Sequence, residues 1–111
     1  MREKNDIDEI FIRERITALR KQKGVSERQM SLDIGKSENY MRNIRTGAVM
    51  PPVSMLLTIC DYVGVSLRDF SDPDLDNPTL MSKLTKTARN LDENSLKAVL
   101  SVANALPKKN N

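Results

Sequence analysis

The stretch GKSENYMRNIRTG, residues 35–47, brings together side chains that could read the edges of nucleic-acid bases. Its spacing predicts a short helix over 38–46, with Ser37 as the N-cap and a glycine at its end. Met41 and Ile44 are three residues apart and share one face, so we expect them to pack inward. The opposite face would then present Glu38, Asn39, Arg42 and Asn43.

Each side-chain type on this outer face has a matching partner in the major groove of B-DNA. Arg can bond guanine through O6 and N7, Asn can bond adenine through N6 and N7, and Glu can accept from N4 of cytosine. A good bidentate contact of this kind discriminates between bases by about 1–3 kcal/mol. We therefore predict a base-reading set made of Ser37, Glu38, Asn39, Arg42 and Asn43.

A second short helix is expected just before this one. Ser26 has the position of an N-cap, and Gln29 follows three residues later as in a capping box. The helix would run to about Ile34 and end at a glycine-containing turn over 35–37. Two short helices joined by such a turn form a helix-turn-helix, and the small Ser31 would suit their crossing point.

The other elements that must support this motif are also helical. Apolar residues at helical spacing predict a first helix over 8–23, a fourth after Pro52 and a brief fifth ending near Phe70. Cys60 falls within the fourth helix, where we expect it to be a core residue. No strand-like alternation occurs. The predicted fold class is all-α, with a five-helix DNA-binding domain over 8–70.

A linker over 71–77 and two amphipathic helices over 78–106 would follow this domain. The apolar stripe of each helix must be buried somewhere. It could pack on the same chain, or it could form the interface of a homodimer, and the two alternatives are compatible. The residues expected at such a dimer interface are Leu84, Leu96, Val99, Leu100, Ala103 and Leu106.

Composition excludes several other classes of function. The chain has 111 residues, one cysteine and no histidine, so it lacks the ligand cluster of a zinc site and the commonest general base. We expect no enzyme activity, cofactor or small-molecule ligand. No apolar run is long enough to span a bilayer, and no secretion signal is recognisable, so a cytoplasmic location is expected. Residues 10–50 carry nine Lys or Arg against four Asp or Glu, a net charge of +5.

Together, RERITALRKQKGVS, MSLDIGKSENYMRNIRTG and PPVSMLLTICDYVGVSLRDF resemble the Xre/Cro, or lambda-repressor-like, family of helix-turn-helix regulators. The resemblance covers about Ile12 to Phe70. It implies a five-helix domain whose third helix enters the major groove of double-stranded DNA. It also implies a homodimer on a roughly palindromic operator, acting in bacterial transcription control, most simply as a repressor.

Three features depart from the pattern of that family. Glu27 stands where the family often has a phosphate-contacting glutamine. Arg20 and Arg45 stand where it often pairs an arginine with a glutamate, so at least one must turn to solvent, another acid or DNA. The loop AVMPP lacks the usual basic residue. We hypothesise that Arg45 approaches phosphate, within a predicted phosphate-contacting set of Arg28, Gln29, Lys36, Tyr40, Arg45 and Thr46.

The leading prediction is thus a sequence-specific DNA-binding regulator. The alternative is a protein-interaction module, or an antitoxin-like partner protein, that retains the fold with weak DNA binding. The replaced residues motivate that alternative, because a protein that touches fewer phosphates binds DNA more weakly, and its salt slope falls by about 0.9 for each phosphate.

Overall fold

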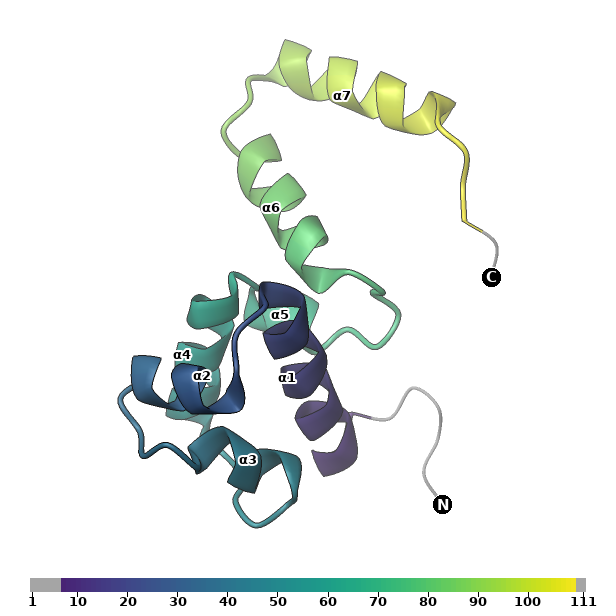
Figure 1. Cartoon of the computed structure of the whole chain (residues 1–111). Helices are drawn as coiled ribbons and strands as arrows, with labels where there is room; N and C mark the ends of the chain where they lie inside the picture. The colour runs from purple at the N-terminus through teal and green to yellow at the C-terminus, as the bar shows by residue number, and fades with distance from the viewer. Residues whose placement is uncertain (1–6, 110–111) are drawn as a thin grey trace.

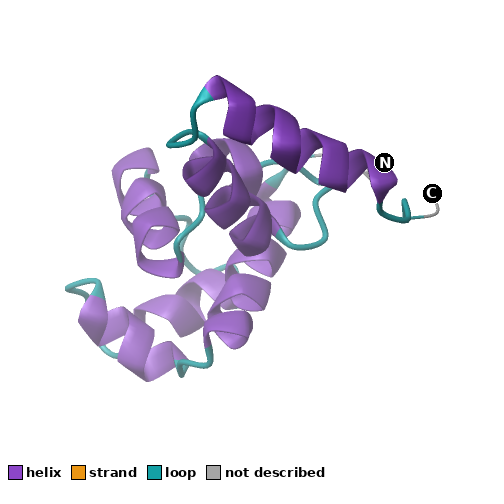
Figure 2. Cartoon of the chain, turned by 90° about the horizontal axis from the view of Figure 1, so that it is seen from above, coloured by secondary structure: helices purple, strands orange, loops and turns teal. Residues whose placement is uncertain are grey.

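The computed structural model describes residues 7–109, which form seven helices and no strand (Figure 1, Figure 2). The predicted all-α class is therefore confirmed. Five helices pack into one body, and two more extend from it as an arm. The helices are α1 (Glu9–Lys23), α2 (Glu27–Asp33), α3 (Tyr40–Arg45), α4 (Val53–Val63), α5 (Leu67–Phe70), α6 (Pro78–Ala88) and α7 (Glu93–Ala105).

Side-chain caps explain where most of these helices begin. The Ser26 hydroxyl accepts from the amide of Gln29 at 3.0 Å, which confirms the predicted cap of α2. Gln29 does not complete the capping box, because its side chain donates to Asp33 at 2.7 Å instead. The remaining side-chain caps are Asp8 on α1, Ser66 on α5, Asn77 on α6 and Asp92 on α7.

All five helices of the body contribute residues to its core. Phe70, the largest fully buried side chain, is 1% exposed and brings α5 against this core. Burial of each large apolar side chain contributes about 1.5–3 kcal/mol. The buried apolar residues are Ile16, Leu19, Met30, Met41, Ile44, Ile59, Cys60, Val63, Val65 and Phe70.

Cys60 is one of these core residues, as the sequence predicted. Burial, together with the nearby charge of Asp61, raises the pKa of its thiol to about 11. The thiol therefore stays protonated near neutral pH, which is the state expected for a small packing residue rather than a reactive one.

The arm formed by α6 and α7 is packed quite differently. Of its helical residues only Pro78 is buried, and α7 contains no buried residue (Figure 1). The apolar stripe predicted for the two helices exists, but it does not pack on the described part of the same chain. Its members stay exposed: Leu84, Leu96, Val99, Leu100, Ala103 and Leu106.

Polar contacts join the arm to the five-helix body. The Ser82 hydroxyl on α6 donates to the Asp69 carboxylate at 2.6 Å and accepts from the Ser66 amide at 3.2 Å. Gln22 on α1 donates to the cap residue Asn77 at 3.2 Å. We call this set of contacts the polar joint. It fixes the direction in which α6 leaves the body.

The segment between α5 and α6, predicted as a linker, is bonded to α1. Arg15 donates to the carbonyl of Leu75 at 3.0 Å and to that of Asp72 at 2.6 Å. The same guanidinium lies 5.0 Å from the centre of the Phe11 ring. Residues 71–77 therefore follow a defined path along α1.

Candidate nucleic-acid interface

The turn between α2 and α3 sets the direction of α3. Gly35 has a φ of +81°, a left-handed conformation that glycine adopts without steric cost. The amide of Lys36 donates to the carbonyl of Ser31 at 2.9 Å and closes the end of α2. This turn is where the sequence predicted it.

The start of α3 differs from the prediction. The helix spans Tyr40–Arg45 rather than 38–46, and Asn39, not Ser37, is its N-cap. The side chain of Asn39 makes no cap hydrogen bond. Instead the Ser37 carbonyl accepts from the Tyr40 amide at 3.0 Å, so residues 37–39 form a turn that leads into the helix. Glu38 and Asn39 therefore project from this turn, and only Arg42 and Asn43 project from the helix itself.

Ser31 joins the two helices of the motif. Its side chain is fully buried, and its hydroxyl accepts from the Met41 amide at 3.0 Å while donating to the Glu27 carbonyl at 2.7 Å. The hydroxyl thus satisfies one of the free amides at the start of α3. Met41 and Ile44, at 2% and 1% exposed, fix the inward face of α3.

The outward side carries the residues predicted to read bases. Ser37, Glu38, Asn39 and Arg42 are exposed, and Asn43 is half-buried. The backbone carbonyl of Asn43 accepts from the Val49 amide at 3.1 Å, which ties the loop after α3 to the helix. One contiguous surface at the end of the body therefore offers amide, carboxylate and guanidinium groups.

An exposed ion pair links this surface to α2. The Arg28 guanidinium lies 3.2 Å from the Glu38 carboxylate, and both side chains are more than half exposed. Arg28 was predicted to contact phosphate and Glu38 to contact bases. Because the pair is solvated, it is worth little to stability, and either partner can exchange it for a contact with another molecule.

Arg45 pairs with Glu27. Its Nε lies 2.6 Å from one Glu27 oxygen, and its Nη2 lies 3.3 Å from the other, a bidentate arrangement. The hydrogen bond from Arg45 lowers the pKa of Glu27, and the same bond raises the pKa of Arg45. Two of the departures from the family pattern therefore compensate each other across α2 and α3.

Arg20, the other arginine in question, donates to the Val25 carbonyl at 2.6 Å. It supports the turn between α1 and α2 instead of pairing with α3. The sequence left solvent, another acid or DNA as partners for Arg45, and in the structure its partner is an acid, Glu27. Its proximity to phosphate remains a prediction.

The other predicted phosphate-contacting residues lie on α3 and on the segments next to it. Lys36 lies 5.1 Å above the ring of the half-buried Tyr40, whose pKa is raised by burial. The Thr46 hydroxyl donates to the Asn43 carbonyl at 3.3 Å at the far end of α3. Gln29 is exposed but is bonded to Asp33 on its own helix.

A further basic surface was not predicted. Arg13 and Lys21 on α1 line a groove of about 550 Å³ with Arg45 at the end of α3. The guanidinium of Arg13 lies so close to Gly47 that a Cβ there would be 3.2 Å from it. The signal was present in the sequence, because residues 13, 17 and 21 are spaced by four and share one helix face.

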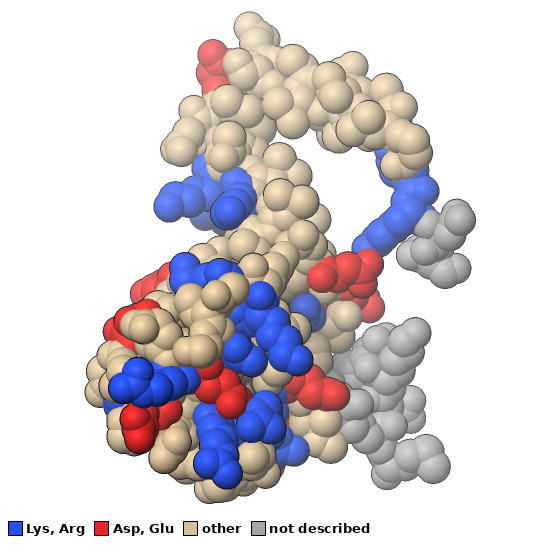
Figure 3. Space-filling model, viewed as in Figure 1, with Lys and Arg blue, Asp and Glu red and all other residues tan. Residues whose placement is uncertain are grey.

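Charges of both signs are spread over the five-helix body, whereas the outer part of the arm is mostly uncharged on the face drawn in Figure 3. Within residues 7–109, no three His, Cys, Asp or Glu side chains are grouped so that they could hold a metal ion. None of the helices in that range is both long and apolar enough to cross a membrane.

Comparison with known proteins agrees with this architecture. Residues 16–70 match the family model described as Helix-turn-helix, a range that runs from within α1 to the end of α5. Domains of this family define a class of DNA-binding transcriptional regulators. Through these residues the chain belongs to the lambda-repressor-like helix-turn-helix family. No curated protein and no solved structure matches it significantly.

Proposed function

We propose that this protein is a sequence-specific transcriptional regulator that reads the major groove of double-stranded DNA with α3 and the turn before it. One observation carries the proposal. Buried Met41, Ile44 and Ser31 hold α3 from behind, so the polar side chains on its other side face solvent as a group. A helix held in this way can enter the major groove without disturbing the core.

The chemistry of the exposed side chains supports base reading. Arg42 offers the fork that matches guanine, Asn39 offers the amide that matches adenine, and Glu38 offers an acceptor for cytosine. Arg28 lies beside Glu38, where it can hold that carboxylate in place or contact the neighbouring phosphate. Lys36 and Thr46 stand at the two ends of the surface and suit contacts to the backbone on either side.

Arg45 can serve phosphate binding without leaving Glu27. The ion pair uses Nε and Nη2 of the guanidinium, which has further N–H donors. Arg13 and Lys21 stand on the other wall of the same groove together with Glu14, so a phosphate there would meet three cations and one carboxylate. This arrangement supports the phosphate role proposed for Arg45.

The exposed stripe of the arm supports a homodimer. Leu84, Leu96 and Leu100 are between 42% and 59% exposed, on helices that have no other cover in the described chain. A continuous apolar surface of this kind marks an interaction site. A second copy would bury both stripes around a twofold axis and place two recognition helices on a palindromic operator.

Truncation after Asp76 tests the dimer. It removes α6 and α7 and leaves all the residues that form the core of the body. Analytical ultracentrifugation is expected to find a dimer for the full chain and a monomer for the truncated one. A truncated chain that still sediments as a dimer would show that the interface lies elsewhere.

Titration of the full chain with a random-sequence fluorescent duplex at several salt concentrations tests DNA binding. We expect binding that weakens with salt, and an Arg45→Gln variant whose salt slope is lower by about 0.9. Lys97→Gln is the matched control, because it removes one charge from the arm. An Arg45→Gln slope equal to that of the control would remove Arg45 from the phosphate-contacting set.

The runner-up function is a protein-interaction module, in the manner of an antitoxin, and the bare apolar face of the arm favours it. In that case the occupant of the stripe would be a different protein, and DNA binding would be weak. The same titration separates the two functions. If the full chain shows no salt-dependent binding to any duplex, the DNA-binding proposal is wrong.

A further inference from the structure

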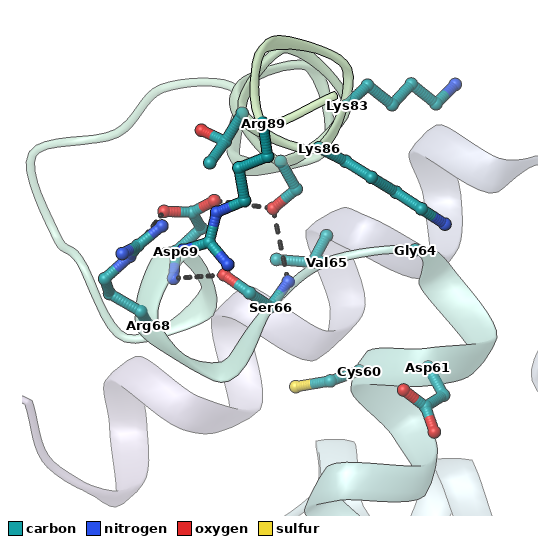
Figure 4. Close-up of a pocket in the computed structure, with 12 residues that line it drawn as sticks. Cys60, Asp61, Gly64, Val65, Ser66, Arg68, Asp69, Lys83, Lys86 and Arg89 are labelled. Carbon is teal, nitrogen blue, oxygen red and sulfur yellow. Dashed lines mark hydrogen bonds and ion pairs between the residues drawn. The ribbon is translucent and has the colours of Figure 1, made fainter. Parts of the chain in front are cut away.

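A pocket of about 710 Å³ lies where the arm meets the five-helix body (Figure 4). Its lower side is formed by the end of α4 and the turn through Gly64, Val65 and Ser66 into α5. Its upper side is α6. The pocket is separate from the base-reading surface, because α3 and α6 lie at opposite ends of the body (Figure 1).

Cations dominate the lining of this pocket. Arg68 comes from α5, Lys83 and Lys86 come from α6, and Arg89 follows the end of α6, against two acids, Asp61 and Asp69. Figure 4 shows Arg89 extending from the upper side toward Ser66 and Asp69, and Lys86 extending toward Gly64, while Lys83 points away.

The acids do not balance these cations. Asp69 is 5% exposed and is already bonded to Ser82, with Arg68 3.7 Å away. Lys86 and Arg89 have no acidic partner among residues 7–109. Lys86 and Arg89, three residues apart at the end of α6, therefore face the pocket without a paired carboxylate. The lining as a whole carries four cations against the two acids, an arrangement that attracts anions.

The rest of the lining suits a small ligand. Val65 is buried and gives the pocket an apolar floor, and Gly64 has no side chain to fill it. The Thr85 side chain lines the upper side and has no hydrogen bond within the described chain, so its hydroxyl is free to bond a ligand. Oxygen atoms of an anion could thus bond a hydroxyl as well as two cations.

We propose that this pocket binds a small, multiply charged anion, such as a phosphorylated or polycarboxylate compound, between α6 and the start of α5. A bound anion would contact Lys86 and Arg89 on the arm and Arg68 on the body. It would thereby add a bridge to the polar joint and hold α6 more firmly. The site depends on these residues alone and does not require that the chain bind DNA.

The test is an NMR titration of the ¹⁵N-labelled full chain at constant ionic strength, with sodium pyrophosphate and sodium citrate as separate probes and sodium chloride as the reference. Saturable shifts are expected at the amides of Val65, Ser66 and Thr85. Stronger binding of pyrophosphate would assign the ligand to phosphorylated compounds, and stronger binding of citrate to polycarboxylates. Slower hydrogen exchange of the α6 amides is expected with the bound probe.

A pair of double variants provides the control. Lys86→Gln with Arg89→Gln removes the two uncompensated cations and should weaken binding by more than about tenfold. Lys97→Gln with Lys109→Gln makes the same change in net charge elsewhere on the chain, at two largely exposed lysines, and should leave binding unchanged.

Three results would overturn the proposal. They are the absence of saturable shifts with both probes, equal weakening by the two double variants, and shifts centred on α3 instead of the pocket. The last would mean that the probe binds as a mimic of DNA phosphate at the recognition surface. Because the pocket lies away from α3, the variants at Lys86 and Arg89 should bind duplex DNA like the wild type, so this test and that of DNA binding can fail separately.

Discussion

The five-helix body and the arm use similar apolar residues in opposite ways. Leu19 in α1 is 3% exposed, whereas Leu100 in α7 is 59% exposed. The body closes its core with its own helices, and it joins the arm through hydrogen bonds and a bonded linker. The body thus closes its own core, while the apolar stripe of the arm stays exposed.

The two regions differ in what holds and covers their helices. In the body, buried Met41, Ile44 and Ser31 hold α3 against the core. The helices of the arm are held in direction by the polar joint, but the described chain does not cover their apolar stripe. We therefore expect substitutions in the two regions to differ in size and in their dependence on protein concentration.

The largest difference should come from one substitution made in both regions. Leu19→Ala removes a buried side chain and should lower the free energy of unfolding by about 2–5 kcal/mol. Leu100→Ala at concentrations where the chain is monomeric should change it by less than about 0.5 kcal/mol. Urea unfolding followed by circular dichroism measures both. Equal losses at low concentration would mean that the arm is covered by its own chain.

A smaller effect should come from the contact that supports α3. Ser31→Ala leaves the Met41 amide without its buried acceptor and should cost about 1–3 kcal/mol. Because the start of α3 is then less fixed, DNA affinity should fall as well. Ser101→Ala on the arm is the matched control for a serine substitution, since Ser101 is exposed and its side chain has no hydrogen bond in residues 7–109. A Ser31→Ala variant as stable as this control would contradict the role given to Ser31.

The polar joint should give a more local effect. Ser82→Ala removes the hydroxyl that bonds both Asp69 and the Ser66 amide. We expect the free energy for opening α6 to fall by about 0.5–1.5 kcal/mol, while exchange of the core amides of α1 and α4 changes little. Hydrogen exchange monitored by NMR resolves the two regions. If α1 and α4 lose as much protection as α6, the arm and the body unfold together.

The smallest effect concerns pH. The pKa of Glu27 is lowered from its usual 4.5 by the hydrogen bond from Arg45. Its contribution to stability is therefore present above about pH 4.5 and is lost as the pH falls through the lower folded-state value. Glu27→Gln should make thermal stability less dependent on pH in that acidic range. Identical pH profiles for Glu27→Gln and the wild type would show that the pair does not stabilise the fold.

Much of this fold could be predicted from local patterns in the sequence. Ser26 caps α2 as predicted, because capping depends on residues three apart, and Asn77 and Asp92 cap α6 and α7 by the same local contact. Met41 and Ile44 are buried because their spacing puts them on one face of a helix. The family resemblance also agreed with the match over residues 16–70.

Contacts between distant residues could not be predicted in the same way. Ser37 has the residue type of an N-cap, but residues 37–39 form a turn and α3 begins at Tyr40. The buried Ser31 hydroxyl accepts from the Met41 amide and so fixes where the helix begins. The pairing of Arg45 with Glu27 depends on how α2 crosses α3. Likewise, an apolar stripe such as that of α7 has the same spacing in the sequence whether it is buried or exposed, so the sequence does not predict its exposure.

The most direct test of the proposed function is selection of bound sequences from a random duplex pool. The wild-type chain should enrich one motif with two related half-sites. Arg42→Gln should lose the preference for guanine at one position in each half-site, a loss of about 1–3 kcal/mol in discrimination. Arg89→Gln, an arginine substitution at the opposite end of the body, should enrich the wild-type motif. No enriched motif from the wild-type chain, or the same motif from Arg42→Gln, would contradict recognition by α3.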